Sequence, residues 1–398
     1  MKLLQLCPRV PFPPVDGGTY GMYSMSKAML KQGASVKVLA FNTSKHFVKP
    51  EQINDEYLTM HHLETVYLNN HPTIFSALSN LFFSNESYHI SRFKNEEFKN
   101  ALIGILKEQE FDIVILEQTV MCIYADVIRK NSTAKIVLRA HNVEHRIWKR
   151  LANSESNPLK KIYLNLLANR LEKFELNTLN KVDAIVTLTE EETKLFKTMS
   201  AIKPIHVSPI CFFLDEFIPV EEPKEFSLFH IGAMDWIPNI TGIKWFLKEV
   251  WSKVNASHPH IKLYLAGNKM PKEFLSFNNN KCIVQGRVED AKKFMTEHSV
   301  MIVPLLAGSG IRVKIVEGMA LGKPIISTSQ GAEGLHYENK KNILIADTAD
   351  EFYNAIIECY QSSELRKTLG ENARTLAMNY YDMNKVGVQV FEFYETLL

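Results

Sequence analysis

The sequence predicts an α/β protein of two domains, each with a parallel sheet flanked by helices. Short apolar runs that suit buried strands alternate with amphipathic segments of helical period along both halves of the 398-residue chain. Such alternation is typical of βαβ units, whose strands pair in parallel and bind ligands at their carboxyl ends. Residues 219–226 contain two prolines and three glutamates, and are expected to link the two series.

The N-terminal half opens with a complete βαβ unit. A strand is expected at 2–7, then a proline-containing loop, a helix from Thr19 to about Gln32 and a second strand at 34–41. Residues 45–100 show little regular period. Further strands of this half are expected at 111–116, 135–140, 182–189 and 203–209.

The C-terminal half repeats the alternation of strand and helix without visible sequence repetition. Two helices are expected between 348 and 378, and a last helix begins near Asp382. The apolar residues of that last helix fall on one side. The strands of this half are expected at 227–232, 261–267, 282–286, 299–306 and 325–329.

The composition indicates a globular protein without a membrane-spanning segment. Apolar residues make up 46% and charged residues 23% of the chain, and no run of about eighteen apolar residues occurs. The net charge of +2 predicts no strong attraction to nucleic acid. The five cysteines are scattered without a C-x-x-C pair, which favours a reducing compartment and indicates neither a zinc knot nor a disulfide framework. A cytoplasmic location is therefore expected.

The stretch 304–335 carries the most specific pattern in the chain. An apolar strand leads into a glycine turn at 308–310, where a ligand can approach the backbone, and a helical pattern begins at Ile311. Gly322 is placed to end this helix before a second apolar strand at 325–329.

The chemistry of this stretch suits a nucleotide. A helix that begins at a glycine turn exposes N–H groups and the positive end of its dipole, and so attracts an anion. Lys314 is expected one turn into the helix, within reach of a phosphate at its start. Glu317 would lie about 9 Å from the start at 1.5 Å per residue, where its carboxylate suits a sugar hydroxyl. The alternative is an ordinary βαβ crossover with a solvated Lys/Glu face.

The same stretch resembles the donor-binding motif of retaining glycosyltransferases with the GT-B fold, the family 4-like enzymes also called glycosyl transferases group 1. Their usual motif is a glutamate, seven residues, a second glutamate and then G-K-P. Glu317 matches the second glutamate, 322–324 match G-K-P, and 331–334 match a following G-x-E-G turn. Ser309 stands in place of the first glutamate. Some branches of the family use G-S-G-I-R-x-K there, as residues 308–314 do.

The resemblance covers nearly the whole chain and implies two facing Rossmann-like domains with parallel sheets. Residues 1–220 would form the acceptor-side domain, and residues 221–380 the domain that binds the nucleotide-sugar donor. Residues 381–398 would form a helix that crosses back to the first domain.

The resemblance also implies roles for individual residues of the C-terminal half. Arg312 and Lys314 would neutralise the leaving diphosphate. The first turn of this half lacks the arginine and lysine that the family commonly has, so these two residues would bear most of its charge. Contacts to the donor are implied for Gly232, Arg287, Val288, Ser309, Gly310, Ile311 and Glu317.

In the N-terminal half, the resemblance places Gly17 and Gly18 along the cleft and His141 against the donor sugar. The bare glycine pair is also compatible with a tight turn at a helix start. Residues 141–145 match H-x-x-E-H as well, a zinc motif that needs both histidines on one helix face and a third ligand. His141 directly follows an expected strand, so sugar contact or a loop histidine bonded to a carbonyl is favoured over zinc, and no metal ligand is assigned.

Residues 146–181 mix eight basic side chains with leucine, isoleucine and aromatic residues. Such a surface could rest on an anionic membrane, where lipid-linked acceptors lie. Glu172 and Glu175 interrupt the basic run, so an ordinary solvated amphipathic helix is an equal alternative.

The resemblance implies an enzyme that moves a sugar from a nucleotide-diphosphate sugar to a hydroxyl group of a cell-envelope glycan or lipid-linked sugar, retaining the anomeric configuration. No cofactor is expected. Metal independence is expected because the chain has no D-x-D pair. The location would be cytoplasmic, with contact to the inner face of the membrane. A nucleotide-sugar epimerase and a non-catalytic nucleotide-sugar-binding protein are the alternatives.

Overall fold

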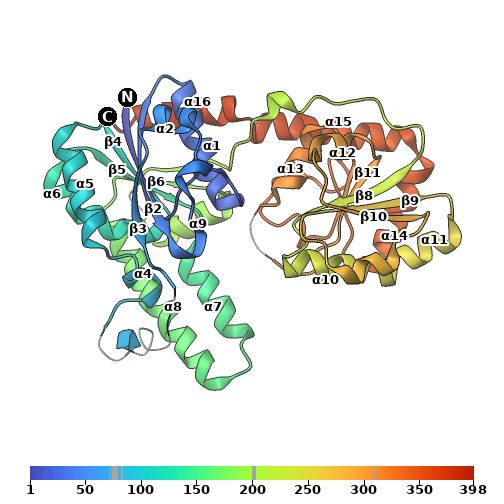
Figure 1. The fold of residues 1–398 in the computed structure, drawn as a ribbon, viewed down its shortest axis with the longest axis horizontal. Coiled ribbons are helices and arrows are strands. Elements are labelled where there is room, and N and C mark those ends of the chain that lie inside the picture. Colours follow the sequence, from blue (N-terminus) through green and yellow to red (C-terminus); the bar gives the residue numbers. More distant parts are fainter. Residues whose placement is uncertain (72, 74–78, 82–83, 200–202, 309–310) are drawn as a thin grey trace. The chain divides into compact units, whose positions relative to one another are not determined.

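The computed structural model describes residues 1–71, 73, 79–81, 84–199, 203–308 and 311–398, which form two compact units (Figure 1). The N-terminal unit comprises Met1–Cys211 with Met383–Leu398, and the C-terminal unit comprises Phe212–Asp382. The expected boundaries after 220 and 380 differ from these limits, because the start and end of the C-terminal unit pair with each other. Phe212 forms a parallel bridge with Asp382, and its N–H donates to the carbonyl of Tyr381 at 2.7 Å.

The N-terminal unit is built on a seven-stranded sheet in which every pairing is parallel. The strand order is β3-β2-β1-β4-β5-β6-β7, so the chain reverses its direction of winding between β1 and β4. The strands are β1 (Lys2–Cys7), β2 (Ser35–Thr43), β3 (Glu64–Leu68), β4 (Ile113–Glu117), β5 (Lys135–Ala140), β6 (Ala184–Thr187) and β7 (Ile205–Val207).

Helices cover both faces of this sheet, as expected for a doubly wound fold (Figure 1). Phe41, Phe98 and Leu116 lie fully buried in the core. The helices of the described residues are α1 (Gly17–Lys31), α2 (Asp55–His61), α4 (Tyr88–Ser91), α5 (Glu96–Glu108), α6 (Ala125–Asn131), α7 (Glu144–Ser154), α8 (Pro158–Leu179), α9 (Glu190–Met199) and α16 (Met383–Glu395).

The last helix, α16, belongs to the N-terminal unit, as the sequence predicts. It packs against α1, with Val386 and Val390 buried. Gly387 permits the contact, because a Cβ at this position would lie 3.1 Å from the Cβ of Ala28. Strand β3 and helix α2, by contrast, come from the stretch 45–100 where no pattern is visible. Most side chains of β3 are exposed, so this edge strand lacks an apolar run.

The C-terminal unit is built on a six-stranded parallel sheet of order β10-β9-β8-β11-β12-β13, with the winding reversed between β8 and β11. Its strands are β8 (Ser227–Ile231), β9 (Lys262–Ala266), β10 (Cys282–Gly286), β11 (Val300–Val303), β12 (Ile325–Ser327) and β13 (Leu344–Ile345). Its helices are α10 (Ile237–Trp245), α11 (Ser252–Ser257), α12 (Ala291–Thr296), α13 (Val313–Ala320), α14 (Ala349–Gln361) and α15 (Ser363–Tyr380), with a π-helical turn at Phe246–Trp251.

Both sheets therefore have a switch point, and in open parallel sheets ligands bind outside the carboxyl ends of the strands at that point. In the N-terminal unit this edge carries the residues after β1, β4 and β5. In the C-terminal unit it carries the residues after β8 and β11, including the start of α13. None of the helices within the described ranges is long and apolar enough to cross a bilayer.

Candidate functional site

In the C-terminal unit, glycine backbones pack against one another at the carboxyl ends of β8, β9 and β10. The Gly232 N–H donates to the carbonyl of Ala266 at 3.2 Å, and the Gly267 N–H donates to the carbonyl of Gly286 at 2.7 Å. A Cβ on Gly267 would lie 1.9 Å from the Gly232 oxygen, so only glycine fits there. Gly286, at φ +67°, then turns the chain into exposed Arg287.

A basic side chain approaches the first turn of this unit from another loop. The Nζ of Lys269, just after β9, lies 2.7 Å from the carboxylate of Asp235, and both groups are exposed. The side-chain amide of Asn239 in α10 donates to the carbonyl of Ala233 at 2.9 Å and so fixes the turn. The turn therefore has a lysine nearby although its own sequence has none.

Helix α13 begins at Val313, two residues later than the sequence predicts. Arg312 is the N-cap residue, with an extended backbone of φ −85° and ψ 96°. The prediction that the helix starts at Ile311 is therefore wrong. Lys314 lies in the first turn rather than one turn in, and Glu317 lies about 6 Å from the start at 1.5 Å per residue. Ser309 and Gly310, also predicted to contact the donor, lie outside the described residues.

The guanidinium of Arg312 lies over the ring of Trp236, 4.9 Å from its centroid. A Cβ on Gly308, which has φ +115°, would lie 2.8 Å from both side chains, so glycine leaves room for this stacking. Burial lowers the pKa of Arg312 from its ordinary value. An arginine stays protonated at neutral pH despite such a shift, so a positive charge is held beside the start of α13.

Lys314 and Glu317, the two residues predicted to hold phosphate and ribose, contact each other. The Nζ of Lys314 donates to Oε2 of Glu317 at 2.6 Å. The glutamate side chain is only 15% exposed, whereas the lysine side chain is more open to solvent. A phosphate at the helix start would thus meet a lysine that is already placed by its neighbour.

The G-K-P part of the motif has a structural role. Gly322, at φ +70°, ends α13. Its N–H donates to the carbonyl of Met319 at 2.9 Å, and the backbone N–H of Lys323 donates to the carbonyl of Gly318 at 2.9 Å. The buried Nζ of Lys323 donates to the carbonyls of Thr296 and His298 at 3.1 and 2.8 Å. Burial lowers the pKa of Lys323 to about 8. This lysine holds the segment before β11 and does not face a ligand.

In the N-terminal unit, a fully buried carboxylate lies at the carboxyl end of β4. Glu117 accepts hydrogen bonds from Nε2 of Gln5 at 2.7 Å, from Nη1 of Arg139 at 3.2 Å, and from Nε2 of His141 at 2.7 Å. Burial raises the pKa of Glu117, but Arg139 and the hydrogen bonds outweigh it and hold the pKa below its ordinary value. Glu117 is therefore an ionised carboxylate with no exposure to solvent.

His141 is placed by this carboxylate. Burial, together with nearby Arg139, lowers the pKa of His141 below its ordinary value despite the attraction of Glu117. The imidazole is thus neutral near pH 7. Because a carboxylate can only accept, Nε2 carries the proton and Nδ1 is left as the acceptor nitrogen. Arg139 also donates to the carbonyl of Gly21 at 3.0 Å, which ties α1, one turn from its start, to the same cluster.

Gly17 and Gly18 form the first turn of α1 at this edge. Asp16 caps the helix by accepting from the N–H groups of Gly18 and Thr19 at 3.0 Å. Arg9 in turn binds both oxygens of Asp16 at 2.6 Å. A Cβ on Gly18 would lie 2.6 Å from Nη2 of Arg9, so the glycine lets the guanidinium lie across the helix start.

The two histidines of the H-x-x-E-H match are held by different carboxylates. Helix α7 begins at Glu144, so His141 precedes it and the two histidines do not share a helix face. Nδ1 of His145 lies 2.6 Å from Oε2 of Glu175, which also accepts from the N–H groups of Glu144 and His145. Across the described ranges, no three His, Cys, Asp or Glu side chains gather as metal ligands.

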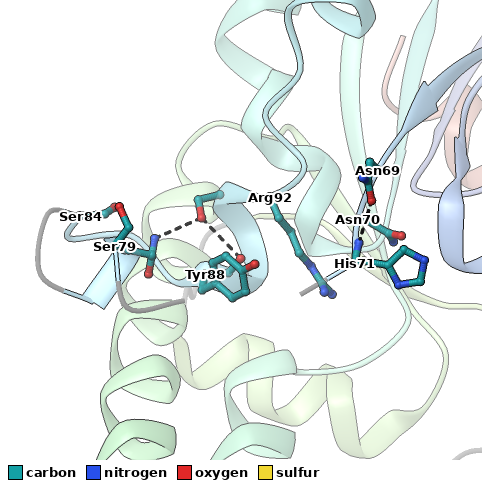
Figure 2. Close-up of a pocket in the computed structure, with 9 residues that line it drawn as sticks. Asn69, Asn70, His71, Ser79, Ser84, Tyr88 and Arg92 are labelled. Atoms are coloured by element: carbon teal, nitrogen blue, oxygen red, sulfur yellow. Dashed lines mark hydrogen bonds between the residues drawn. The ribbon is translucent and has the colours of Figure 1, made fainter. Parts of the chain in front are cut away.

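A hollow of about 460 Å³ lies after the carboxyl end of β3 (Figure 2). All of its lining residues have polar side chains, which is the lining that hydroxyl-rich ligands need. In Figure 2, Arg92 and His71 lie on one side of it and Ser84 on the other. The lining residues are Asn69, Asn70, His71, Ser79, Asn80, Ser84, Tyr88, Ser91 and Arg92.

Comparison with known proteins agrees with this arrangement. Residues 225–362, most of the C-terminal unit, match the family model of glycosyl transferases group 1. HepE from Anabaena, solved with UDP, superposes with a TM-score of 0.66 at 15% identity, with 100% of both chains covered. Sucrose-phosphate synthase from Thermosynechococcus elongatus superposes with a TM-score of 0.69 at 16% identity, covering 100% of this chain and 99% of that one. Residues 225–362 form a group 1 glycosyltransferase domain, and the whole chain has the GT-B fold.

A curated relative of the glycosyltransferase comes from Klebsiella pneumoniae and is named an uncharacterized 44.6 kDa protein in the cps region. It is 26% identical over 316 residues, which cover 74% of this chain and 77% of the relative.

The structure groups the predicted residues of the transferase by unit. Gly232, Arg287, Val288, Arg312, Lys314 and Glu317 come from loops and a helix start at the carboxyl edge of the C-terminal sheet. His141 and the first turn of α1 share the corresponding edge of the N-terminal sheet.

Sequence reasoning missed Glu117, Lys269 and the structural role of Lys323. Glu117 could have been found, because it ends a buried parallel strand, where ligand-facing polar residues are expected. Lys269 and Lys323 gave no such signal, because their partners are distant in the sequence.

Replacement of Lys323 by alanine should destabilise the C-terminal unit. The substitution leaves the buried carbonyl of His298 and the partly buried carbonyl of Thr296 without this donor, at about 1–3 kcal/mol for a lost buried partner. Exposed Lys367 in α15 is the matched control, and its change to alanine should leave the thermal midpoint unchanged. If Lys323→Ala melts like the control but binds nucleotide more weakly, the lysine is a ligand residue after all.

Proposed function

We propose that this glycosyltransferase moves a sugar, with retention of anomeric configuration, from a nucleotide-diphosphate sugar to a hydroxyl group of a cell-envelope glycan or lipid-linked acceptor. The observation that carries the proposal is the placement of Arg312, Lys314 and Glu317 at the switch point of a group 1 domain. A nucleotide-sugar donor is supported by HepE, solved with UDP and with UDP-glucose. A cell-envelope product is supported by the cps-region relative.

The donor diphosphate would bind at the start of α13. The helix N–H groups and the guanidinium of Arg312 would face it, with Lys314 in the first turn completing the positive charge. Glu317 would accept from the ribose hydroxyls. The backbone after β10, at Arg287 and Val288, would contact the base, and Gly232 leaves space at the first turn. Among the described residues, Ile311 completes the proposed donor contacts.

In the reaction, the bond between the anomeric carbon and the diphosphate oxygen breaks, and the acceptor oxygen bonds to that carbon. The acceptor proton passes to the departing diphosphate, whose negative charge Arg312 and Lys314 stabilise. Stabilising charge that develops on a leaving group is a large source of rate acceleration. No protein nucleophile is assigned.

His141 would contact the donor sugar as a neutral hydrogen-bonding group. With Nε2 donating to Glu117, the bare Nδ1 accepts from a hydroxyl, and Glu117 fixes this tautomer. Gly17 and Gly18 would line the same side. The protein would act in the cytoplasm at the inner face of the membrane.

The assay for the overall proposal is release of free nucleotide from a panel of nucleotide sugars, with and without a hydroxyl acceptor. A transferase releases nucleotide in step with glycosylated product, and NMR of that product gives its anomeric configuration. Conversion of one nucleotide sugar into another without any release would indicate an epimerase. Binding without either reaction would indicate a non-catalytic protein.

Activity should persist in the presence of a chelator, because basic side chains and helix N–H groups would neutralise the diphosphate and the chain has no D-x-D pair. The measurement is initial rate with and without EDTA, at matched ionic strength. Loss of turnover in EDTA that manganese restores would contradict metal independence.

His141→Gln should lower kcat at least tenfold and change the nucleotide dissociation constant less than twofold. Glutamine can still donate to the buried Glu117, but it lacks the imidazole acceptor proposed to face the sugar. Calorimetry gives the affinity, and thermal melting reports on folding. Weakened nucleotide binding together with a lower melting temperature would mean that His141 is structural.

Lys314→Ala and Glu317→Gln should weaken the binding of different ligands. The lysine variant loses a charge-assisted contact of roughly 1.5–3 kcal/mol, which is about a tenfold to hundredfold loss for the nucleoside diphosphate. Its weak binding of the bare nucleoside should barely change. The glutamate variant should lose affinity for both ligands by similar factors, because both carry the ribose.

Lys340→Ala in the same unit is a control for the removal of an exposed lysine. If Lys314→Ala and Glu317→Gln both bind like the parent, the two residues are only a surface ion pair. Equal losses on both ligands in the lysine variant would indicate damage to the domain.

A further inference from the structure

Helices α7 and α8 form a hairpin that projects from the rest of the N-terminal unit (Figure 1). Its base is anchored by Glu175 of α8, which accepts from His145 and from the first N–H groups of α7. Leu164, Leu167 and Leu171 bury one face of α8. The hairpin is therefore a fixed part of the unit, and its far end can carry a contact surface.

The far end of the hairpin exposes apolar side chains on both helices. On α8, Leu159 is 78% and Ile162 is 67% exposed, three residues apart on one helix face. On α7, Leu151 is 49% exposed. Leu159 and Ile162 lie away from the face of α8 that carries the buried leucines. We call residues 150–162 the hairpin tip.

Basic charge is concentrated on the same tip. Three basic side chains lie between residues 150 and 162 with one acidic side chain, a net charge of +2. The tip thus carries the whole net charge of the chain, and the remainder is neutral. The basic residues of the tip are Arg150, Lys160 and Lys161.

One lysine of the tip is engaged in a surface ion pair that a stronger anionic surface can replace. Lys160 lies 2.5 Å from the carboxylate of Glu155. The lysine is well exposed, and surface pairs of this kind contribute little to stability. This pair does not cancel the excess of positive charge on the tip.

We propose that the hairpin tip docks on an anionic lipid membrane, with Leu159 and Ile162 entering the interface and the basic side chains facing lipid phosphates. Apolar side chains bordered by lysine and arginine are the combination that binds membrane surfaces through both burial and electrostatic attraction. A nucleic acid would use the basic charge but not the leucine and isoleucine. The inference deepens the proposed function, on which it rests, because docking would bring the enzyme to lipid-linked acceptors.

The test is co-sedimentation of the full-length protein with vesicles of phosphatidylcholine alone and of phosphatidylcholine mixed with phosphatidylglycerol. The parent should pellet with the mixed vesicles at low salt, and salt should weaken this binding. Leu159→Ser with Ile162→Ser should reduce the bound fraction at least fivefold. Lys160→Glu with Lys161→Glu should abolish it.

Ile218→Ser with Val220→Ser is the matched control. These residues are 71% and 52% exposed, but glutamates 221 and 222 follow them instead of lysines. The control should pellet like the parent. Thermal melting checks that every variant is folded.

A parent that ignores mixed vesicles, or binds both vesicle types equally, would overturn the inference, as would tip variants that bind like the control. Nucleotide release with a water-soluble acceptor is measured in parallel and should be equal in all variants. Absence of any release while vesicle binding follows the expected pattern would count against the proposed function alone.

Discussion

The parallel pairing of the strands is the constraint on which the rest of the structure depends. Every strand in each sheet runs in the same direction, so the loops after the strands meet at one edge. The winding reverses between β1 and β4 in one unit and between β8 and β11 in the other, which opens a place for a ligand at that edge. Glu117, His141 and the start of α1 lie at the first edge, and Gly232 and the start of α13 at the second.

The buried charge of Glu117 shows how the N-terminal edge is held in one geometry. An ionised carboxylate without solvent contact needs several hydrogen-bond donors. Gln5 in β1, Arg139 in β5 and His141 just after β5 supply them. Removing one partner of such a buried cluster typically costs about 3–5 kcal/mol, because a charge is left uncompensated. The same cluster that fixes the imidazole of His141 thus joins β1, β4, β5 and α1.

The family motif combines ligand-facing and structural residues. Arg312, Lys314 and Glu317 lie at the partly buried start of α13, where N–H groups remain available. Gly322 ends the helix, and the side chain of Lys323 binds backbone carbonyls before β11, inside the unit. One short sequence therefore both positions the helix and supplies its charged groups. A lysine does not have to bind phosphate merely because it belongs to the motif.

The sequence alone determined the alternation of strands and helices, the two sheets and the glycine at the end of α13, because these follow from local apolar period and backbone freedom. It did not reveal edge strand β3, whose exposed side chains lack an apolar pattern. Only the tertiary structure decided that α13 starts at Val313, where Arg312 stacks on Trp236, and that Lys269 approaches the turn after β8. It also decided that Glu117 holds His141. Each of these depends on a contact between residues far apart in the chain, which no local pattern encodes.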